Sequence, residues 1–184
     1  METKYIDLFT EHRQTIDSKS ASVLNSRRDE AFGFFKKLGF PNRQLEDYQY
    51  SDVANEFVPD YGLNISRFPV KVDPYKAYRC NVDGITSHLY FLLNDMLYTG
   101  NQPEAVLPSG VFIGSLKEFA EKHSDICEKY YGKIAKLENN GVAAFNTMFA
   151  QDGFVIYLPD NTVLDKPVQL INILTANADF LVNR

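Results

Sequence analysis

The chain has 184 residues, of which 45% are hydrophobic and 23% charged, with a formal net charge of −5. A chain of this length can bury a sizeable core without disulfides or a structural metal, and its mixed charges exclude an intrinsically disordered protein. Basic residues occur only in isolated pairs such as Arg27-Arg28, so no basic stripe indicates nucleic acid as a partner. No apolar run approaches the length of a membrane span, and the first residues lack the apolar core of a secretory signal. We therefore interpret Cys80 and Cys127 as reduced thiols of a cytoplasmic protein.

Residues 1–60 are predicted to form an N-terminal helical unit with two amphipathic helices. The apolar residues of the first helix recur at helical spacing, at Tyr5, Leu8, Phe9, His12 and Ile16. The second has a longer apolar stripe, made of Val23, Leu24, Ala31, Phe34, Phe35 and Leu38. We predict one continuous second helix that stops at Gly39, because glycine tolerates the left-handed cap and Pro41 cannot continue the helix.

Residues 61–140 are predicted to be a mixed α/β segment. Proline and glycine are spaced through residues 56–74, which predicts a loop or hinge there. Two β-rich runs, 87–93 and 96–99, then follow on either side of Asn94-Asp95. Both turn residues tolerate the positive φ angles of a tight turn, so the pattern predicts a β-hairpin.

A short strand at 111–113 is predicted to lead into a capped helix. Ser115 and Glu118 have the spacing of a capping box, in which the two side chains satisfy free N–H groups of the first turn. The helix is predicted to run to about Gly132. It would bury five residues: Leu116, Phe119, Ala120, His123 and Cys127.

Residues 141–184 form the third predicted segment, which is rich in short strands. A helix-like run at 142–149 ends before the turn at Asp152-Gly153, and apolar runs follow at 154–158 and 168–174. Among these 44 residues only six are charged: Asp152, Asp160, Asp165, Lys166, Asp179 and Arg184. Low charge and frequent corners favour stacked strands, and periodicity alone leaves a simple antiparallel sheet as an equal alternative.

The histidines do not form a metal site in the sequence pattern. His123 and Cys127 are four residues apart on one helix face, but a structural zinc site needs a second pair of ligands. We interpret them as a partly buried helix face. His88 is interpreted as a polar position on a half-exposed strand, and His12 as a packing or boundary residue of the first helix.

Catalytic constellations are also missing from the pattern. Cys80 follows Arg79, which is a weak indication of an activated thiol, whereas Cys127 lies toward the wrong end of its helix. Ser115 is accounted for by capping, and Ser109 lacks the G-x-S-x-G context of a nucleophile elbow. Neither phosphate-binding glycine motif occurs. The carboxylate pairs, Asp29-Glu30 and Glu46-Asp47, are typical of solvated surfaces, so no catalytic, cofactor-binding or metal residue is predicted.

Two series of motifs together resemble the SufD group of the SufB/SufD family, which assembles iron–sulfur clusters in the SUF system. The first is GFPNR at 39–43 followed by LEDYQYSDV at 45–53. The second comprises LPSGV at 107–111, Phe145-Asn146, QDGFVIYLP at 151–159 and KPVQL at 166–170. Tyr48, Gln49 and Ser51 depart from the family's tryptophan, basic residue and threonine. The cysteine-rich motif of SufB has no counterpart, so the resemblance favours SufD.

The resemblance implies an α+β fold in which the helical unit, the hairpin and the capped helix precede a right-handed parallel β-helix. Residues 141–184 would hold its first strands, with the remainder beyond Arg184. It also implies a non-enzymatic scaffold that contacts SufB-like and SufC-like proteins. No cofactor is expected on this part, because the family assembles clusters elsewhere in the complex.

Two further interpretations stay open at the level of sequence. One is a small cytosolic enzyme or ligand-binding domain with a cleft near Arg79, Cys80 and His88. The other concerns association: an unpaired strand edge invites pairing with another chain, which predicts a homodimer or a strand swap through residues beyond Gly153.

Overall fold

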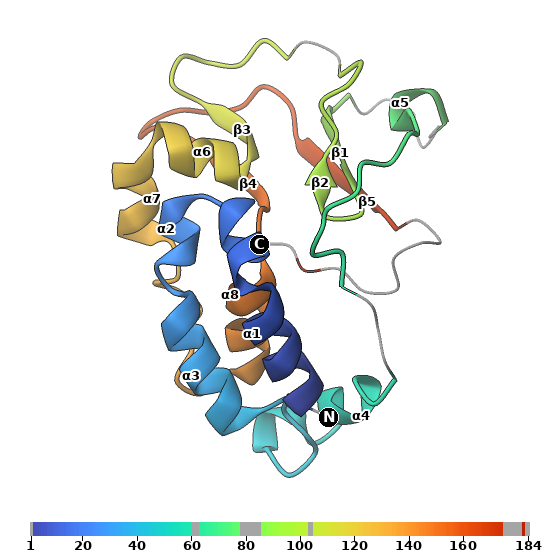
Figure 1. Cartoon of the computed structure of the whole chain (residues 1–184). Coiled ribbons are helices and arrows are strands. Elements are labelled where there is room, and N and C mark those ends of the chain that lie inside the picture. Colours follow the sequence, from blue (N-terminus) through green and yellow to red (C-terminus); the bar gives the residue numbers. More distant parts are fainter. Residues whose placement is uncertain (1, 60–62, 78–85, 103–104, 175–181, 183–184) are drawn as a thin grey trace.

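The computed structural model describes residues 2–59, 63–77, 86–102, 105–174 and 182, and it is a mixed α+β fold, as predicted. Helices gather beside two small sheets (Figure 1). The elements in chain order are α1 (Glu2–Ser18), α2 (Ser22–Asn25), α3 (Arg28–Leu38), the 3-10 turn η1 (Glu46–Tyr48), α4 (Val53–Glu56), α5 (Pro74–Ala77), β1 (His88–Leu93), β2 (Met96–Leu97), β3 (Phe112–Ser115), α6 (Leu116–Lys122), α7 (Ser124–Tyr130), α8 (Gly141–Phe149), β4 (Phe154–Tyr157) and β5 (Val168–Ile173). In the part of the chain that is described, no helix is both long and apolar enough to cross a membrane.

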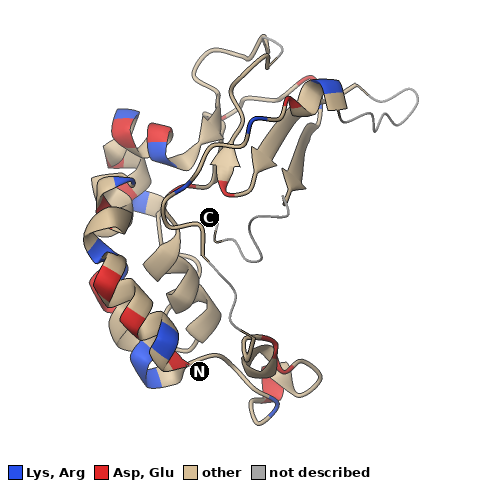
Figure 2. Ribbon diagram, turned by 45° about the vertical axis from the view of Figure 1, so that its right-hand side comes forward, with Lys and Arg blue, Asp and Glu red and all other residues tan. Residues whose placement is uncertain are grey.

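The main core lies where α1, α3 and α8 pack together, and it is rich in aromatic rings. Phe145 of α8 is at its centre, with ring centroids 5.1 Å from Tyr5 and 5.0 Å from both Phe40 and Phe149. Such edge-on and tilted pairs add to the free energy gained by burying the rings. In Figure 2 the ribbon of the outer helices is coloured at many Lys, Arg, Asp and Glu positions, whereas α8 contains no charged residue. The predicted division into 1–60, 61–140 and 141–184 stays a prediction, although α8 of the third segment shares this core with α1 and α3.

The second helix is not continuous, contrary to prediction. It is interrupted at Ser26-Arg27 between α2 and α3, and the next residue, Arg28, is fully buried at 0% exposure. Its guanidinium donates from Nη1 to the carbonyl oxygens of Thr147 (3.1 Å) and Met148 (2.6 Å). Nη2 donates to the carbonyl of Ala150 at 2.8 Å. The interruption therefore places a cation on the carbonyls at the C-terminal end of α8.

Arg28 is itself held in place by polar groups of the neighbouring helices. Its Nε donates to Asn25 Oδ1 at 3.0 Å and lies 3.2 Å from Asp17 Oδ1. Burial lowers the pKa of Arg28 to about 10, so the guanidinium remains charged at neutral pH. The negative end of the α8 dipole further favours the charged form.

The start of α8 crosses the end of α3 at two glycines. Gly39 has a φ of 62° and ends α3, as predicted, with its N–H donating to Phe35 O at 2.8 Å. A Cβ at Gly141 would lie 1.8 Å from the Gly39 carbonyl oxygen. Since that neighbour is backbone rather than a flexible side chain, only glycine fits at position 141.

The capped helix is also divided into two. Ser115 Oγ accepts from Glu118 N at 3.1 Å, which confirms the serine half of the predicted capping box. The chain then leaves helical geometry at His123 (φ −133°, ψ 52°), which ends α6 and precedes α7. This bend lets both short helices cover one core: Leu116, Phe119, Ala120 and Cys127 are buried as predicted, together with Ala21, Val23 and Leu24. His123 is only half-buried, with its ring 5.0 Å from that of Phe119.

The larger sheet has the strand order β2-β1-β5. The predicted hairpin is confirmed: β1 and β2 are antiparallel with Leu93 opposite Met96, and Asn94 has a φ of 54°. β5 runs parallel to β1, from the pair His88–Val168 to the pair Leu93–Ile173.

The smaller sheet pairs β3 with β4 in antiparallel fashion. The two strands that follow Gly153, β4 and β5, thus belong to different sheets. In the described residues they form neither a simple antiparallel sheet with each other nor a β-helix, so the β-helix stays a prediction.

A buried ionic junction fastens the loop before α5, where a hinge was predicted. Arg67 Nη2 donates to the Asp95 carbonyl at 2.8 Å and lies 3.3 Å from Asp152 Oδ2. Asp152 Oδ1 in turn accepts from Ser115 Oγ and from Lys117 N, each at 2.9 Å. Burial raises the pKa of Asp95, and the nearby Arg67 charge opposes that change. The junction joins the hairpin turn to the beginning of α6.

Replacing Arg28 tests its role as the cap of α8. Arg28→Ala removes three buried hydrogen bonds from the end of α8, and we expect it to lower the free energy of unfolding by about 3–5 kcal/mol. The control is Arg27→Ala, because Arg27 is partly exposed and pairs with Glu30 at 2.8 Å. That change should cost no more than about 1 kcal/mol. Urea unfolding measures both variants. Equal losses of unfolding free energy would contradict the role of Arg28 as the cap of α8.

A pair of glycine substitutions tests the crossing of α3 and α8. Gly141→Ala forces a methyl group onto backbone, and we expect it to destabilise the fold by about 3 kcal/mol. Gly33 is exposed in α3, with nothing within 4 Å of an added Cβ. Gly33→Ala should therefore raise stability by up to about 1 kcal/mol, since alanine favours helix. Thermal unfolding of both variants provides the measurement; a stable Gly141→Ala variant would show that the crossing can move apart.

Candidate functional site

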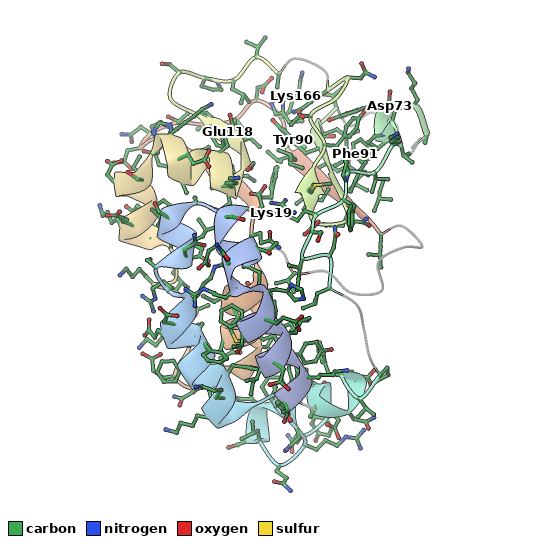
Figure 3. All side chains as sticks on the ribbon, in the orientation of Figure 1. Lys19, Asp73, Tyr90, Phe91, Glu118 and Lys166 are labelled. Carbon is green, nitrogen blue, oxygen red and sulfur yellow. The ribbon has the colours of Figure 1, made fainter. Side chains whose placement is uncertain are left out.

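A cleft of about 440 Å³ lies beside the first residues of β1. Its lining includes Tyr75, His88, Tyr90, Asp165 and Lys166. Successive residues of β1 point to opposite faces of the sheet, as Tyr90 and Phe91 do in Figure 3. Tyr90 meets Phe154 with ring centroids 5.3 Å apart, whereas Phe91 meets Tyr75 at 4.8 Å.

His88 is buried in the cleft. The prediction that it lies on a half-exposed strand was wrong. Its side chain is 8% exposed, and Nε2 lies 3.0 Å from Asp165 Oδ1. The backbone N–H of His88 donates to Pro167 O at 2.9 Å. The hydrogen bond to His88 holds the pKa of Asp165 below its usual range. This partner was missed because it lies 77 positions after His88 in the sequence.

The other titratable groups of the cleft are not suited to proton transfer near neutral pH. Tyr75 donates its hydroxyl proton to Leu89 O at 2.8 Å, and burial raises its pKa to about 12. Burial also raises the pKa of Tyr90. The predicted companions of His88, Arg79 and Cys80, lie outside the described residues. The described part of the cleft therefore offers a histidine–carboxylate pair and aromatic walls, which can bind a small polar ligand.

The remaining candidate residues are placed separately. Cys127 is buried, and burial raises the pKa of its thiol, which makes the thiolate scarce. His123 rests against Phe119, and His12 is half-buried on α1. Of the paired carboxylates, Asp29 and Glu30 lie beside Arg13 and Arg27, and Glu46-Asp47 is exposed in η1. No group of three or more His, Cys, Asp or Glu side chains is placed to hold a metal ion, within the residues described.

The motif after Gly39 forms an exposed surface. Phe40 anchors it by stacking on Phe57, with centroids 4.0 Å apart, and Ala54 N donates to Pro41 O at 2.9 Å. The chain then turns outward through η1 and leaves Tyr50 89% exposed. Tyr50 and Leu45, which is 51% exposed, are therefore accessible to another protein.

The open edge of β5 is a second surface of this kind. β1 is its only partner in the described sheet. Asn94 N donates to Ile173 O at 2.8 Å and His88 N to Pro167 O at 2.9 Å. Because parallel strands bond their neighbour through alternate residues, Leu170 and Asn172 direct their N–H and C=O groups to the open side. The edge can therefore accept another strand.

Comparison with known proteins identifies the family. A model of the SufBD protein N-terminal region matches residues 1–170. An iron-sulfur cluster assembly SufBD family protein of Arabidopsis thaliana is 35% identical over 65 residues, which cover 35% of this chain and 14% of that protein. A chloroplastic SufBD family protein of the same plant is 33% identical over 60 residues, 33% of this chain and 11% of the relative. The iron-sulfur cluster assembly protein SufD of Bacillus subtilis is 29% identical over 75 residues, 40% of this chain and 17% of the relative.

These matches thus span between 11% and 17% of the length of the three relatives. No solved structure matches the chain. The family model, by contrast, covers nearly the whole sequence, including both series of motifs. The resemblance drawn from those motifs is confirmed, and the chain belongs to the SufBD family.

Proposed function

We propose that this chain is the N-terminal part of a SufD-type scaffold subunit for iron–sulfur cluster assembly. It is non-enzymatic, is located in the cytoplasm, and acts through contacts with SufB-like and SufC-like proteins. The observation that carries the proposal is the family match over residues 1–170. SufD is favoured over SufB because the cysteine-rich motif of SufB has no counterpart in the given sequence.

The pairing and the open edge of β5 support a β-helix in this scaffold subunit. A parallel β-helix grows by stacking each strand in register beside an earlier parallel one, and six successive pairs join β1 to β5 in this way. We propose that β5 belongs to the first rung of a right-handed parallel β-helix. Clusters would be assembled elsewhere in the complex, so this part would bind no cofactor of its own.

The cleft beside His88 favours a second candidate, a ligand-binding function. Its volume of about 440 Å³ lies within the range of small-molecule sites, roughly 300–1,000 Å³. The histidine–carboxylate pair would fix the orientation of a polar ligand.

A second copy of the chain, paired along β5, is the alternative to a SufB-like partner.

Co-expression with SufB-like and SufC-like proteins tests the scaffold proposal. We expect affinity purification of the chain to retain the SufB-like partner. Asn172→Pro should reduce retention at least tenfold, because it removes an N–H on the open side of β5 without taking a bond from β1. Val163→Asp is the control, since Val163 is 83% exposed and outside this edge.

Circular dichroism establishes that each variant is folded. A folded wild-type chain that retains neither partner would overturn the scaffold proposal. If retention is lost equally in Asn172→Pro and Val163→Asp, the edge of β5 is not the surface involved. A chain that forms only dimers, which Asn172→Pro dissociates, would assign the edge to a second copy instead.

A further inference from the structure

A long groove lies between β4 and α7. It has a volume of about 930 Å³. Seven successive residues, 154–160, line it, so β4 and the residues after it form one complete wall. Ile126, Tyr130 and Ile134 contribute to the other wall, and Ile134 is 91% exposed. An apolar side chain this exposed beside an apolar groove indicates a surface that another group covers.

Within the described residues, β4 has no sheet partner on the side away from β3. In an antiparallel ladder, directly opposed residues alternate between hydrogen-bonded and non-bonded pairs. Leu116 N donates to Gly153 O at 3.0 Å, which fixes the phase of this alternation. The pairs Gly114–Val155 and Phe112–Tyr157 are then the bonded ones. Consequently Phe154 and Ile156 direct their N–H and C=O groups away from β3.

The side chains of β4 show which face an added strand would cover. Val155 and Tyr157 pack on the core of α6 and α7, and the Tyr157 ring centroid is 5.4 Å from that of Phe119. Ile156 and Leu158, on the other face, remain exposed. A strand laid beside β4 would therefore place alternate side chains toward Tyr130 and Ile134, and the others toward solvent.

The shape and chemistry of the groove favour one extended segment over other occupants. The four residues of β4 extend about 13 Å, and the outward backbone groups of Phe154 and Ile156 match a strand rather than a helix, whose own groups are paired internally. Charged groups of the lining are Asp125, Asp160 and Lys129, so their net charge disfavours an acidic segment.

We propose that β4 and α7 form a docking site for an extended, non-acidic segment of a partner protein, with apolar residues at alternate positions. The segment adds to β4 as a third strand and inserts its apolar side chains between β4 and Tyr130 and Ile134. Because the groove and the β5 edge belong to different sheets, this docking stands independently of the proposed scaffold function.

Fluorescence anisotropy with a synthetic peptide tests the docking site on the full chain. The probe is a labelled peptide of alternating valine and threonine with a lysine at each end. Two further probes have the same sequence. One is N-methylated at the amides along one edge of the strand, and the other at the amides along the opposite edge. We expect saturable binding of the first probe and at least tenfold weaker binding when one edge is methylated. Methylation of the opposite edge should leave binding unchanged.

Two variants with a matched control separate the edge from the apolar wall. Ile156→Pro removes an N–H on the open side of β4 and keeps the bonds to β3, so the fold should be retained while binding falls at least tenfold. Ile134→Asp should weaken binding by a similar factor, whereas Val163→Asp, at a valine that is 83% exposed and outside the groove, should not. Circular dichroism checks each fold.

Peptide binding that is absent, or equal for both N-methylated probes, would overturn the docking site. So would binding that Ile134→Asp leaves intact, because the apolar wall would then play no part. Should Ile156→Pro unfold the chain, the methylated probes alone decide. A wild-type dimer in sedimentation that Ile134→Asp dissociates would assign the groove to a second copy and would also overturn the proposal.

Discussion

The cap that Arg28 provides for α8 is the interaction on which the helical part depends. α8 is the only element of the main core without charge, and its last carbonyls end inside the protein, away from water. A buried carbonyl without a donor costs as much as a lost hydrogen bond, so α8 requires a polar partner at this end. The guanidinium meets this requirement because it carries several donors in one plane and can reach three carbonyls at once. The interruption between α2 and α3 follows from that position.

Local patterns in the sequence predicted most elements but not their interruptions. Apolar spacing indicated α1, α8 and the strands, and Asn94-Asp95 indicated the hairpin, because these signals arise within a few residues. The interruption at Ser26-Arg27 depends instead on carbonyls about 120 residues away in the chain. An arginine near the start of a helix has no sequence signal that distinguishes a solvated side chain from a buried one. The bend at His123 likewise reflects the core that α6 and α7 share with α2.

The candidate sites likewise combine residues that local patterns indicated with partners that only distant contacts bring close. His88 was singled out from the sequence, but its partner Asp165 lies 77 positions later, and proximity of this kind depends on the pairing of β5 with β1. The ionic junction of Arg67, Asp95 and Asp152 was missed for the same reason, although Asp95 and Asp152 both lie in turns that the sequence marked. Turn residues are typically interpreted by their backbone preference, and here their carboxylates also join separate segments. Family membership rests on the ordered motifs, and fold alone would not have indicated a function.

The order β2-β1-β5 makes the two edges of the larger sheet unequal. On one side the hairpin returns as β2, only two residues long, and Tyr75 donates its hydroxyl to Leu89 O on the part of β1 that β2 does not reach. On the other side β5 presents six residues in regular extended geometry. Short edge strands are a common means of preventing unwanted association, and this sheet has that protection on one side only. Growth of the sheet, whether by the same polypeptide or by another, is therefore confined to a single side, with β1 and β2 as its fixed base.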